Sequence, residues 1–333
     1  MSKRRIILAG GSGFLGNALA KHFCERGDEV IVFTRQPRGR SDGVKEISWD
    51  ARMLGSWAQF VDGADVVINL AGRSVDCRYN AKNRHDIIAS RVDSTRVLGE
   101  AIARAQQPPR VWLNSSSATI YKHTFDTPMD ENGATGATPE AHDAFSIEVI
   151  EQWEKALNVD YGMRSAESSQ SLLTSAATRT RKVALRISLV LGEAGGVFPV
   201  LRRLTRFGLG GRMGSGRQFV SWIHVADFLR AVDWLIEHDE ISGPVNLAAP
   251  NPLPNAEMMR LFREAGGVPF GLPATETMLE VGAFLLRTET ELILKSRRVV
   301  PGRLLAAGFQ FQFPELRAAL KILAAAGSEN SPA

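Results

Sequence analysis

Short apolar runs alternate along the chain with longer stretches in which apolar residues recur every three to four positions. The short runs have the length of strands, and the recurring positions have the period of amphipathic helices. Strands are predicted at 5–9, 29–33, 46–49, 65–71, 110–114, 182–190 and 244–249, and the longest helix is predicted at 83–104. Strands separated by helices form parallel sheets with helices on both faces. The pattern therefore predicts an α/β protein with a Rossmann-type, doubly wound parallel sheet.

Segments that contain glycine and proline interrupt this pattern in the last third of the chain, which predicts a smaller lobe of mixed structure. We expect a Rossmann domain over 1–187 with a strand returning to its sheet near 244–249, a substrate lobe with a small C-terminal domain over 188–327, and a flexible tail at 328–333. The stretch 161–182 is rich in Ser, Thr and Ala and is predicted to be a surface insertion.

The composition excludes some classes of function. The 333 residues carry a net charge of only +4, and the basic residues are scattered along the chain, which argues against a nucleic-acid or membrane-surface role. Cys24 and Cys77 lack the spacing of a metal site, so no metal is expected. No apolar run is long enough to cross a bilayer, and the start is too short for a signal peptide. We expect a cytoplasmic protein whose oligomeric state the sequence does not fix.

The segment "GGSGFLG" follows the first predicted strand and opens the first predicted helix. In such a unit Gly10 permits a tight turn, Gly13 lets the backbone approach a pyrophosphate, and Gly16 lets the helix pack on the strand. Free N–H groups at the helix start favour phosphates. We predict a dinucleotide site here, with Phe14 and Leu15 among its contacts; the alternative is a tight turn with a structural role.

The second predicted strand ends in "VIVFTRQPRGR", residues 30–40. In this fold that strand end lies beside the adenosine ribose, where an acid would bind the 2′-hydroxyl of NAD and repel the 2′-phosphate of NADP. Thr34 and Arg35 stand at that place instead. Because a guanidinium binds phosphate bidentately and stacks on adenine, the cofactor is predicted to be NADP(H), with Arg35 as its main contact. Arg38 and Arg40 either assist or are solvated loop residues.

Further motifs resemble the extended short-chain dehydrogenases/reductases. They are "NLAG" (69–72), "SSSATIY" (115–121) and "WIHVADFLRAV" (222–232). The segments "GLGGRMGSGRQFVSWIHVADFLRA", "GPVNLAAPNPLPNAEM" and "SRRVVPGRLLAAGFQF" are similar to the atypical, NAD-dependent epimerase/dehydratase-like branch, whose members end in a small domain of unknown function. The likeness covers nearly the whole chain apart from 161–182.

The resemblance implies a nicotinamide site at the carboxyl ends of the strands. Leu70 and Ala71 would line the cofactor through their backbone, and Val190 would lie near the nicotinamide. Arg91 stands where typical members carry Asn and lies near an apolar helix face, so we expect it to face the cofactor or the substrate. The alternative is that Arg91 pairs with Asp86 or another acid. Asp86 itself is either a cofactor contact or an exposed acid.

Ordinary members of this family use a Ser, a Tyr and a Lys, of which the Tyr transfers the proton. Ser117 stands in the Ser position, where it would orient the substrate oxygen, but Phe145 and Val149 stand where the Tyr and the Lys belong. Neither side chain can carry a proton. Tyr121 is the nearest phenol and a candidate proton donor. A structural or substrate-lining role for it is the alternative, with water or the substrate as the proton source.

Nucleotide-sugar members often carry an Arg just ahead of the segment 222–232, where this chain has Val220 and Ser221. This difference argues against a nucleotide-sugar substrate. Arg212, Arg217 and Gln218 could replace that Arg, or they could belong to a flexible loop.

Three functions therefore remain. The first is an NADP(H)-dependent oxidoreductase acting on a small carbonyl or alcohol substrate, with Ser117 holding the oxygen. The second is a non-catalytic NADP(H) sensor, in which the cofactor changes a surface read by a partner. The third is a nucleotide-sugar epimerase or dehydratase, which rests on overall similarity alone. The missing Tyr and Lys favour the sensor, whereas Ser117 and the substrate lobe favour the oxidoreductase.

Overall fold

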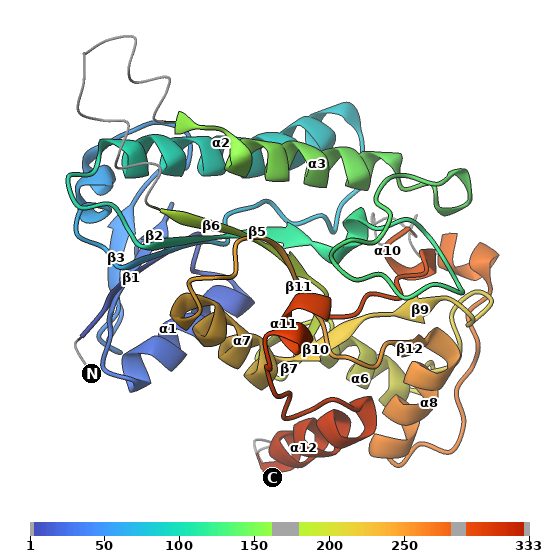
Figure 1. Ribbon diagram of the computed structural model, residues 1–333. Coiled ribbons are helices and arrows are strands. Elements are labelled where there is room, and N and C mark those ends of the chain that lie inside the picture. Colours follow the sequence, from blue (N-terminus) through green and yellow to red (C-terminus); the bar gives the residue numbers. More distant parts are fainter. Residues whose placement is uncertain (1–2, 162–179, 281–290, 330–333) are drawn as a thin grey trace.

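The computed structural model describes residues 3–161, 180–280 and 291–329, and its centre is a seven-stranded parallel sheet (Figure 1). In spatial order the strands are β11 (Gly243–Leu247), β6 (Arg181–Ile187), β5 (Val111–Ser117), β4 (Val66–Asn69), β1 (Arg5–Ala9), β2 (Glu29–Thr34) and β3 (Lys45–Ser48). All neighbouring pairs run parallel. The strand order reverses between β1 and β4, which is where doubly wound sheets bind their ligands. The predicted fold class is confirmed.

The alternation of side chains along the strands supplies two separate cores. Ile6 and Leu8 of β1 are buried against α1 (Phe14–Glu25) and α7 (Val225–Glu237), whereas Ile7 lies in the core under α2 (Ala81–Arg104). Figure 1 shows α2 and α3 (Ala144–Asn158) along one face of the sheet and α1 and α7 along the other. Both faces are covered, as a parallel sheet requires.

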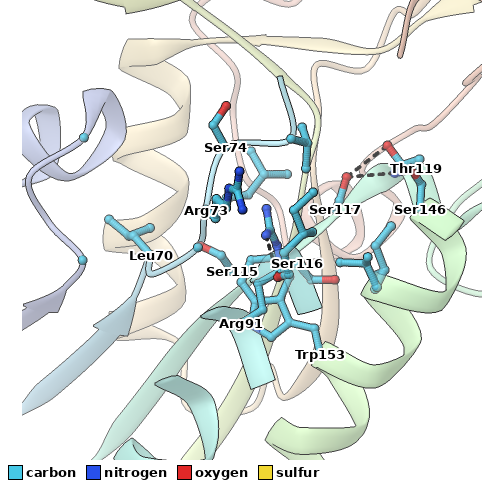
Figure 2. A pocket seen from close by; sticks show the side chains of 18 of the residues that line it. Leu70, Arg73, Ser74, Arg91, Ser115, Ser116, Ser117, Thr119, Ser146 and Trp153 are labelled. Carbon is cyan, nitrogen blue, oxygen red and sulfur yellow. Dashed lines mark hydrogen bonds between the residues drawn. The ribbon is translucent and has the colours of Figure 1, made fainter. Parts of the chain in front are cut away.

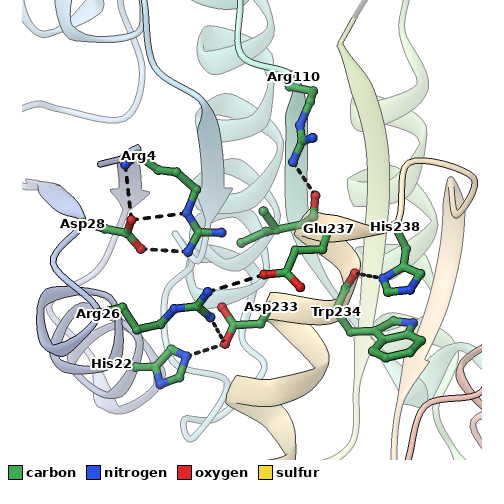
Figure 3. Close-up of polar contacts among 10 residues, drawn as sticks. Arg4, His22, Arg26, Asp28, Arg110, Asp233, Trp234, Glu237 and His238 are labelled. Carbon is green, nitrogen blue, oxygen red and sulfur yellow. Dashed lines mark hydrogen bonds and ion pairs between the residues drawn. The ribbon is translucent and has the colours of Figure 1, made fainter. Parts of the chain in front are cut away.

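Ion pairs join α1 to α7 at the end of the sheet where the strands begin (Figure 3). Asp233 Oδ2 of α7 lies 2.6 Å from Nε2 of His22 in α1 and 2.5 Å from Nη1 of Arg26, the C-cap residue of α1. Beside them Arg4 and Asp28 pair at 2.8 Å. The glycine loop lies at the other end of α1, so these pairs fix the helix at the end remote from that loop.

The predicted strand 182–190 is in fact two strands that belong to different sheets. The break falls at Ser188, whose backbone N and Oγ both donate to Leu247 O, at 3.1 and 2.7 Å. Beyond it β7 (Leu189–Gly192) pairs with β10 (Trp222–His224) and β8 (Gly195–Gly196). The chain thereby leaves the main sheet after β6 and enters the smaller lobe.

The smaller lobe is mixed, as predicted, and has its own core. Its remaining elements are α6 (Phe198–Arg206), β9 (Phe219–Val220), β12 (Leu253–Pro254), α8 (Asn255–Ala265), α10 (Glu291–Leu294) and α12 (Leu316–Glu329). Trp222, Phe262 and Leu320 are buried together in this core. The short helix α11 (Gly302–Ala306) instead buries Leu304 in the core of the main sheet. Short 3₁₀ turns lie elsewhere in the chain, at Ser56–Phe60, Ala118–Ile120 and Pro139–Ala141.

Two sequence predictions fall wholly or partly on residues that are not described. The predicted insertion at 161–182 lies mostly in 162–179, outside the described residues. The predicted tail at 328–333 begins inside α12, and 330–333 lie outside the described residues. Within the described ranges, none of the helices is both long and apolar enough to pass through a membrane.

Candidate cofactor and substrate site

Two adjoining cavities open at the carboxyl ends of the parallel strands. The larger has a volume of about 1390 Å³ and lies beside the end of β2, and the smaller has a volume of about 530 Å³ and lies beside the end of β5. Both are lined by Gly10, Gly13, Leu70, Gly72 and Arg73. Because they share this wall, the two cavities form one elongated hollow with the glycine loop at its middle.

The glycine loop has open space beside Gly13 but none beside Gly10 or Gly16. A Cβ on Gly10, whose φ is +72°, would lie 2.6 Å from Ala71 Cα, and one on Gly16 would lie 2.4 Å from Gly11 Cα. A Cβ on Gly13 would meet no atom within 4 Å. Gly13 caps α1 without any side-chain hydrogen bond, so the first N–H groups of the helix remain available. The loop therefore fits a dinucleotide pyrophosphate.

Phe14 and Leu15, the first residues of α1, line the smaller cavity. Leu70, after β4, lines both cavities, and Ala71 lines the larger one. Val190 is buried in β7 and lines neither cavity, so it does not fit the expected place beside the nicotinamide. The chain has left the main sheet before Val190, because β6 ends at Ile187 and Val190 pairs with Ile223 of β10.

Thr34 and Arg35 lie at the end of β2 in the wall of the larger cavity. Thr34 is buried, and its Oγ1 accepts a hydrogen bond from Gln36 N at 3.3 Å. The Arg35 side chain is exposed and makes no hydrogen bond or ion pair with any residue that the structure describes. Arg35 is therefore a free cation at the place where the sequence predicts a 2′-phosphate.

The other charges of the larger cavity are partly neutralised. Arg40 pairs with Asp42 at 2.6 Å and donates to Asn17 Oδ1 at 2.7 Å. Glu46 also lines this cavity, and its Oε2 accepts from the backbone N of Arg38 at 2.6 Å. In all, five arginines and two carboxylates are found among the described lining residues. The cavity therefore favours an anionic ligand, and Arg40 is less available to it than Arg35.

Serines from the end of β5 line the smaller cavity (Figure 2). Ser117 Oγ donates to Thr119 Oγ1 at 3.1 Å and accepts from Thr119 N at 3.2 Å, which fixes its position. Phe145 and Val149 of α3 line the same cavity. The residues that replace the usual Tyr and Lys thus face the place where chemistry would occur, but they offer it no proton.

Tyr121 lies outside both cavities. Its side chain is 1% exposed, its hydroxyl donates to Asn246 Oδ1 at 2.8 Å, and it accepts from Arg186 Nη1 at 2.9 Å. Burial raises the pKa of the phenol, although the Arg186 charge opposes the shift. This placement does not fit the expectation that Tyr121 donates a proton to the substrate. It supports the alternative of a structural role.

A chain of polar contacts links Tyr121 to the cavity wall. Arg186 donates to both carboxylate oxygens of Glu154 at 2.9 Å, and Glu154 Oε1 accepts from Ser116 Oγ at 2.6 Å. Each of these groups has its partner inside the protein. The chain therefore positions Ser116 at the end of β5, beside Ser117.

The arrangement of Arg73, Asp86 and Arg91 settles one alternative from the sequence. Asp86 Oδ2 pairs with Arg73 Nη1 at 2.5 Å, and among the described residues no ion pair joins Asp86 to Arg91. Arg91 lines the smaller cavity, donates to Ile87 O at 3.0 Å and lies 5.1 Å from the ring centre of Trp153 (Figure 2). Burial lowers the Arg91 pKa to about 10. Asp86 lines neither cavity.

The three residues that could have replaced the Arg of nucleotide-sugar members do not reach the cavities. Gln218 is buried and donates to Met213 O at 2.8 Å. Arg212 donates to Gly214 O at 3.1 Å within its own loop, and Arg217 lies over the ring of Phe125. The structure therefore brings none of Arg212, Arg217 and Gln218 into the lining of either cavity.

Lys295, from the C-terminal part of the chain, supports the floor of the site and was missed from sequence. Its Nζ donates to Thr119 O at 2.6 Å and pairs with Asp143, the N-cap residue of α3, with both side chains fully buried. Burial lowers the Lys295 pKa, and Asp143 opposes the shift. Lys295 is 176 residues from Thr119 in sequence, so no local pattern could have shown the contact.

The fold and the hollow together define a Rossmann-type protein with its candidate site at the carboxyl ends of the parallel strands. Residues 6–248 match the model of the NAD dependent epimerase/dehydratase family, and residues 275–323 match a domain of unknown function, DUF1731. The chain belongs to the NAD dependent epimerase/dehydratase family, which confirms the resemblance found in the sequence.

Three relatives illustrate the similarity. Epimerase family protein SDR39U1 of Bos taurus is 32% identical, with 95% of this chain and 98% of the relative covered. The crystal structure of human SDR39U1 with NADPH has a TM-score of 0.80 at 31% identity and covers 98% of this chain and 100% of that one. A nucleoside-diphosphate sugar epimerase from Corynebacterium glutamicum has a TM-score of 0.73 at 27% identity, covering 97% of this chain and 58% of that one.

Proposed function

We propose that the chain is an NADP(H)-dependent oxidoreductase that acts on a small carbonyl or alcohol substrate which is not a nucleotide. One observation carries the proposal: a continuous hollow runs from the free cation of Arg35, past the open glycine loop, to the hydroxyl of Ser117. The human relative crystallised with NADPH supports the choice of cofactor.

The residues that line the hollow indicate which part of the cofactor each cavity would hold. The N–H groups at the start of α1, next to Gly13, would hold the pyrophosphate, and Arg35 would hold the 2′-phosphate. Leu70 and Ala71 would line the cofactor between these points. The nicotinamide end would then lie in the smaller cavity, where a bound cofactor would supply or accept a hydride.

Ser117 is the residue that would hold the substrate oxygen. Thr119 fixes its Oγ on the wall of the smaller cavity, and the one hydroxyl proton, which Ser117 donates to Thr119 Oγ1, would turn to the substrate oxygen. Phe145 and Val149 would exclude water from one side of the substrate. Because neither can exchange a proton, the proton that accompanies hydride transfer would come from water or from the substrate.

The test is to follow NADPH absorbance while the protein is offered small aldehydes and ketones. We expect at least one compound to be reduced, and we expect Ser117→Ala to slow that reaction by about 100-fold while leaving NADPH affinity unchanged. A reaction that Ser117→Ala leaves at full rate would contradict the role given to Ser117.

A second candidate is the non-catalytic NADP(H) sensor, and one observation favours it. Phe145 and Val149, which cannot exchange a proton, face the cavity in place of the usual Tyr and Lys. In that case NADPH would bind tightly, but no carbonyl compound would be reduced. Limited proteolysis with NADP⁺ and with NADPH would then give different cleavage patterns, because the cofactor state changes the surface.

The nucleotide-sugar epimerase remains the weaker alternative, supported by the Corynebacterium structure. The described residues that line the smaller cavity include none of Arg212, Arg217 and Gln218, so the replacements that the sequence offered for the usual diphosphate-binding Arg do not reach it. A change in the fluorescence of bound NADPH when UDP-glucose is added would favour this alternative. The absence of any change would exclude UDP-glucose as a ligand.

A further inference from the structure

We propose that the smaller cavity binds a small substrate that carries a carboxylate on an otherwise apolar body, and that Arg91 holds the carboxylate. This inference deepens the proposed function, since it assigns a chemical class to the substrate of the same site.

The charges around the smaller cavity point to an anionic ligand. Among the described residues that line it, the only charged side chains are Arg73 and Arg91, and none is a carboxylate. Arg73 already has a partner, because Asp86 pairs with it at 2.5 Å from outside the lining. The cavity is left with one uncompensated positive charge, that of Arg91.

Arg91 has donors left to offer. A guanidinium carries five N–H donors, and the one hydrogen bond found for Arg91 uses Nη1, which donates to Ile87 O at 3.0 Å. Within the described parts of the chain no carboxylate lies at ion-pair distance, and the Trp153 ring gives only a weak cation–π contact at 5.1 Å. A half-buried cation without a counter-ion is unfavourable, and a carboxylate would satisfy it with two parallel hydrogen bonds.

The other residues that line the smaller cavity indicate what the uncharged part of the ligand should be. Val75, Phe145, Val149 and Ile150 give the cavity a mostly apolar surface, and Ser117 adds a hydroxyl. The volume of about 530 Å³ would also hold the nicotinamide end of the cofactor, so the space left suits a small molecule. The chemistry that fits is an aromatic or branched aliphatic oxo acid or hydroxy acid.

A phosphate of the cofactor could also be the anion, but the placement of Arg91 argues against it. The pyrophosphate site has its own donors in the N–H groups at the start of α1. Arg91 belongs to α2 and lies against Trp153 of α3, next to the serines from β5 (Figure 2). It therefore faces the part of the hollow that lies beyond the glycine loop.

The experiment compares benzoate with benzamide, two probes of the same shape that differ in charge. Each is titrated by calorimetry into the wild-type protein saturated with NADPH, and the melting temperature is recorded with and without each probe. We expect benzoate to bind and to raise the melting temperature, and benzamide to bind at least about tenfold more weakly. Equal binding of the two probes, or no binding of benzoate, would overturn the proposal.

Variants of two arginines on α2 then assign the effect. Arg91→Met keeps an unbranched side chain against Trp153 but removes the charge, so it should abolish the difference between benzoate and benzamide. Arg91→Lys should retain part of it, because an ammonium cannot bind a carboxylate bidentately. Arg104→Met, at the exposed C-terminal end of α2, is the matched control and should bind benzoate as the wild type does.

The affinity for NADPH separates the two sources of an anion. If Arg91 holds the substrate, Arg91→Met should bind NADPH with a dissociation constant within about twofold of the wild type. A loss of NADPH affinity of tenfold or more, with benzoate affinity unchanged, would assign Arg91 to a cofactor phosphate and overturn the proposal. Failure of the proposed function would give a different result, namely no binding of NADPH by the wild-type protein. The benzoate titration can be repeated without cofactor, and its result then does not depend on NADPH binding.

Discussion

Tyr121 donates a hydrogen bond from its hydroxyl to Asn246 Oδ1 at 2.8 Å, inside the protein and away from both cavities. Because the same oxygen accepts from Arg186, Tyr121→Phe would leave two buried polar groups without this partner. We expect the substitution to lower the free energy of unfolding by about 1–3 kcal/mol. Urea unfolding of the wild type and the variant measures the difference.

The same variant separates structure from catalysis. Tyr121→Phe should bind NADPH with wild-type affinity and reduce any carbonyl substrate at the wild-type rate, measured at a temperature where both proteins are folded. A turnover loss of about 100-fold with unchanged stability would show instead that Tyr121 takes part in proton transfer.

Tyr121 also gives the protein a dependence on alkaline pH. Burial raises the pKa of its phenol in the folded state above the value of about 10 in the unfolded chain. A group whose folded-state pKa is raised contributes its full stability below the unfolded value and loses it as the pH rises through the folded value. As the pH rises above about 10, the free energy of unfolding should therefore fall more steeply for the wild type than for Tyr121→Phe. Parallel slopes would contradict this account.

The glycine loop offers a matched pair of substitutions. Gly16→Ala would place a Cβ 2.4 Å from Gly11 Cα, and we expect it to cost about 1–3 kcal/mol of stability because backbone must move. Gly13→Ala would meet no protein atom and should fold as the wild type does.

Gly13→Ala should nevertheless weaken NADPH binding by roughly tenfold or more, since its methyl group would occupy the approach of the pyrophosphate. Fluorescence titration with NADPH, beside a melting curve for each variant, checks both results. Wild-type NADPH affinity in Gly13→Ala would leave the loop with a structural role only.

Arg91 is expected to bind the ligand but to lower the stability of the folded protein. Burial lowers its pKa to about 10, which means that the folded protein disfavours its charged form. Arg91→Met should therefore keep or raise the melting temperature, by roughly 1–3 °C, because it removes an uncompensated charge. Differential scanning calorimetry measures the change. A drop of about 5 °C or more would show that Arg91 mainly stabilises the protein.

Much of the fold could be predicted from the sequence, because local signals specify it. The buried strand before Gly10 and the helix that starts after Gly13 are read from hydrophobic period and turn chemistry, and the structure has both. The break of the strand 182–190 could not be read, since Arg186 and Ser188 keep the polar–apolar alternation of a single strand. The split depends on Ser188 bonding to Leu247, 59 residues away.

The candidate site was predictable where one segment supplies it and less so where distant segments meet. Ser117, Phe145 and Arg91 could be placed from motifs, and the structure gathers them around one cavity. The partner of Asp86 was not evident, because Arg73 competes with Arg91 only once the loop after β4 is folded against α2. Lys295 gave no signal at all, since a lone lysine far along the chain reads as a surface residue.

The preference for NADP(H) depends most on the free cation at Arg35, which would bind the phosphate that distinguishes NADP(H) from NAD(H). The direct measurement is a pair of calorimetric titrations of the purified protein, one with NADPH and one with NADH. We predict a dissociation constant for NADPH that is at least about tenfold lower than that for NADH. Tight binding of NADH with no detectable binding of NADPH would contradict the account.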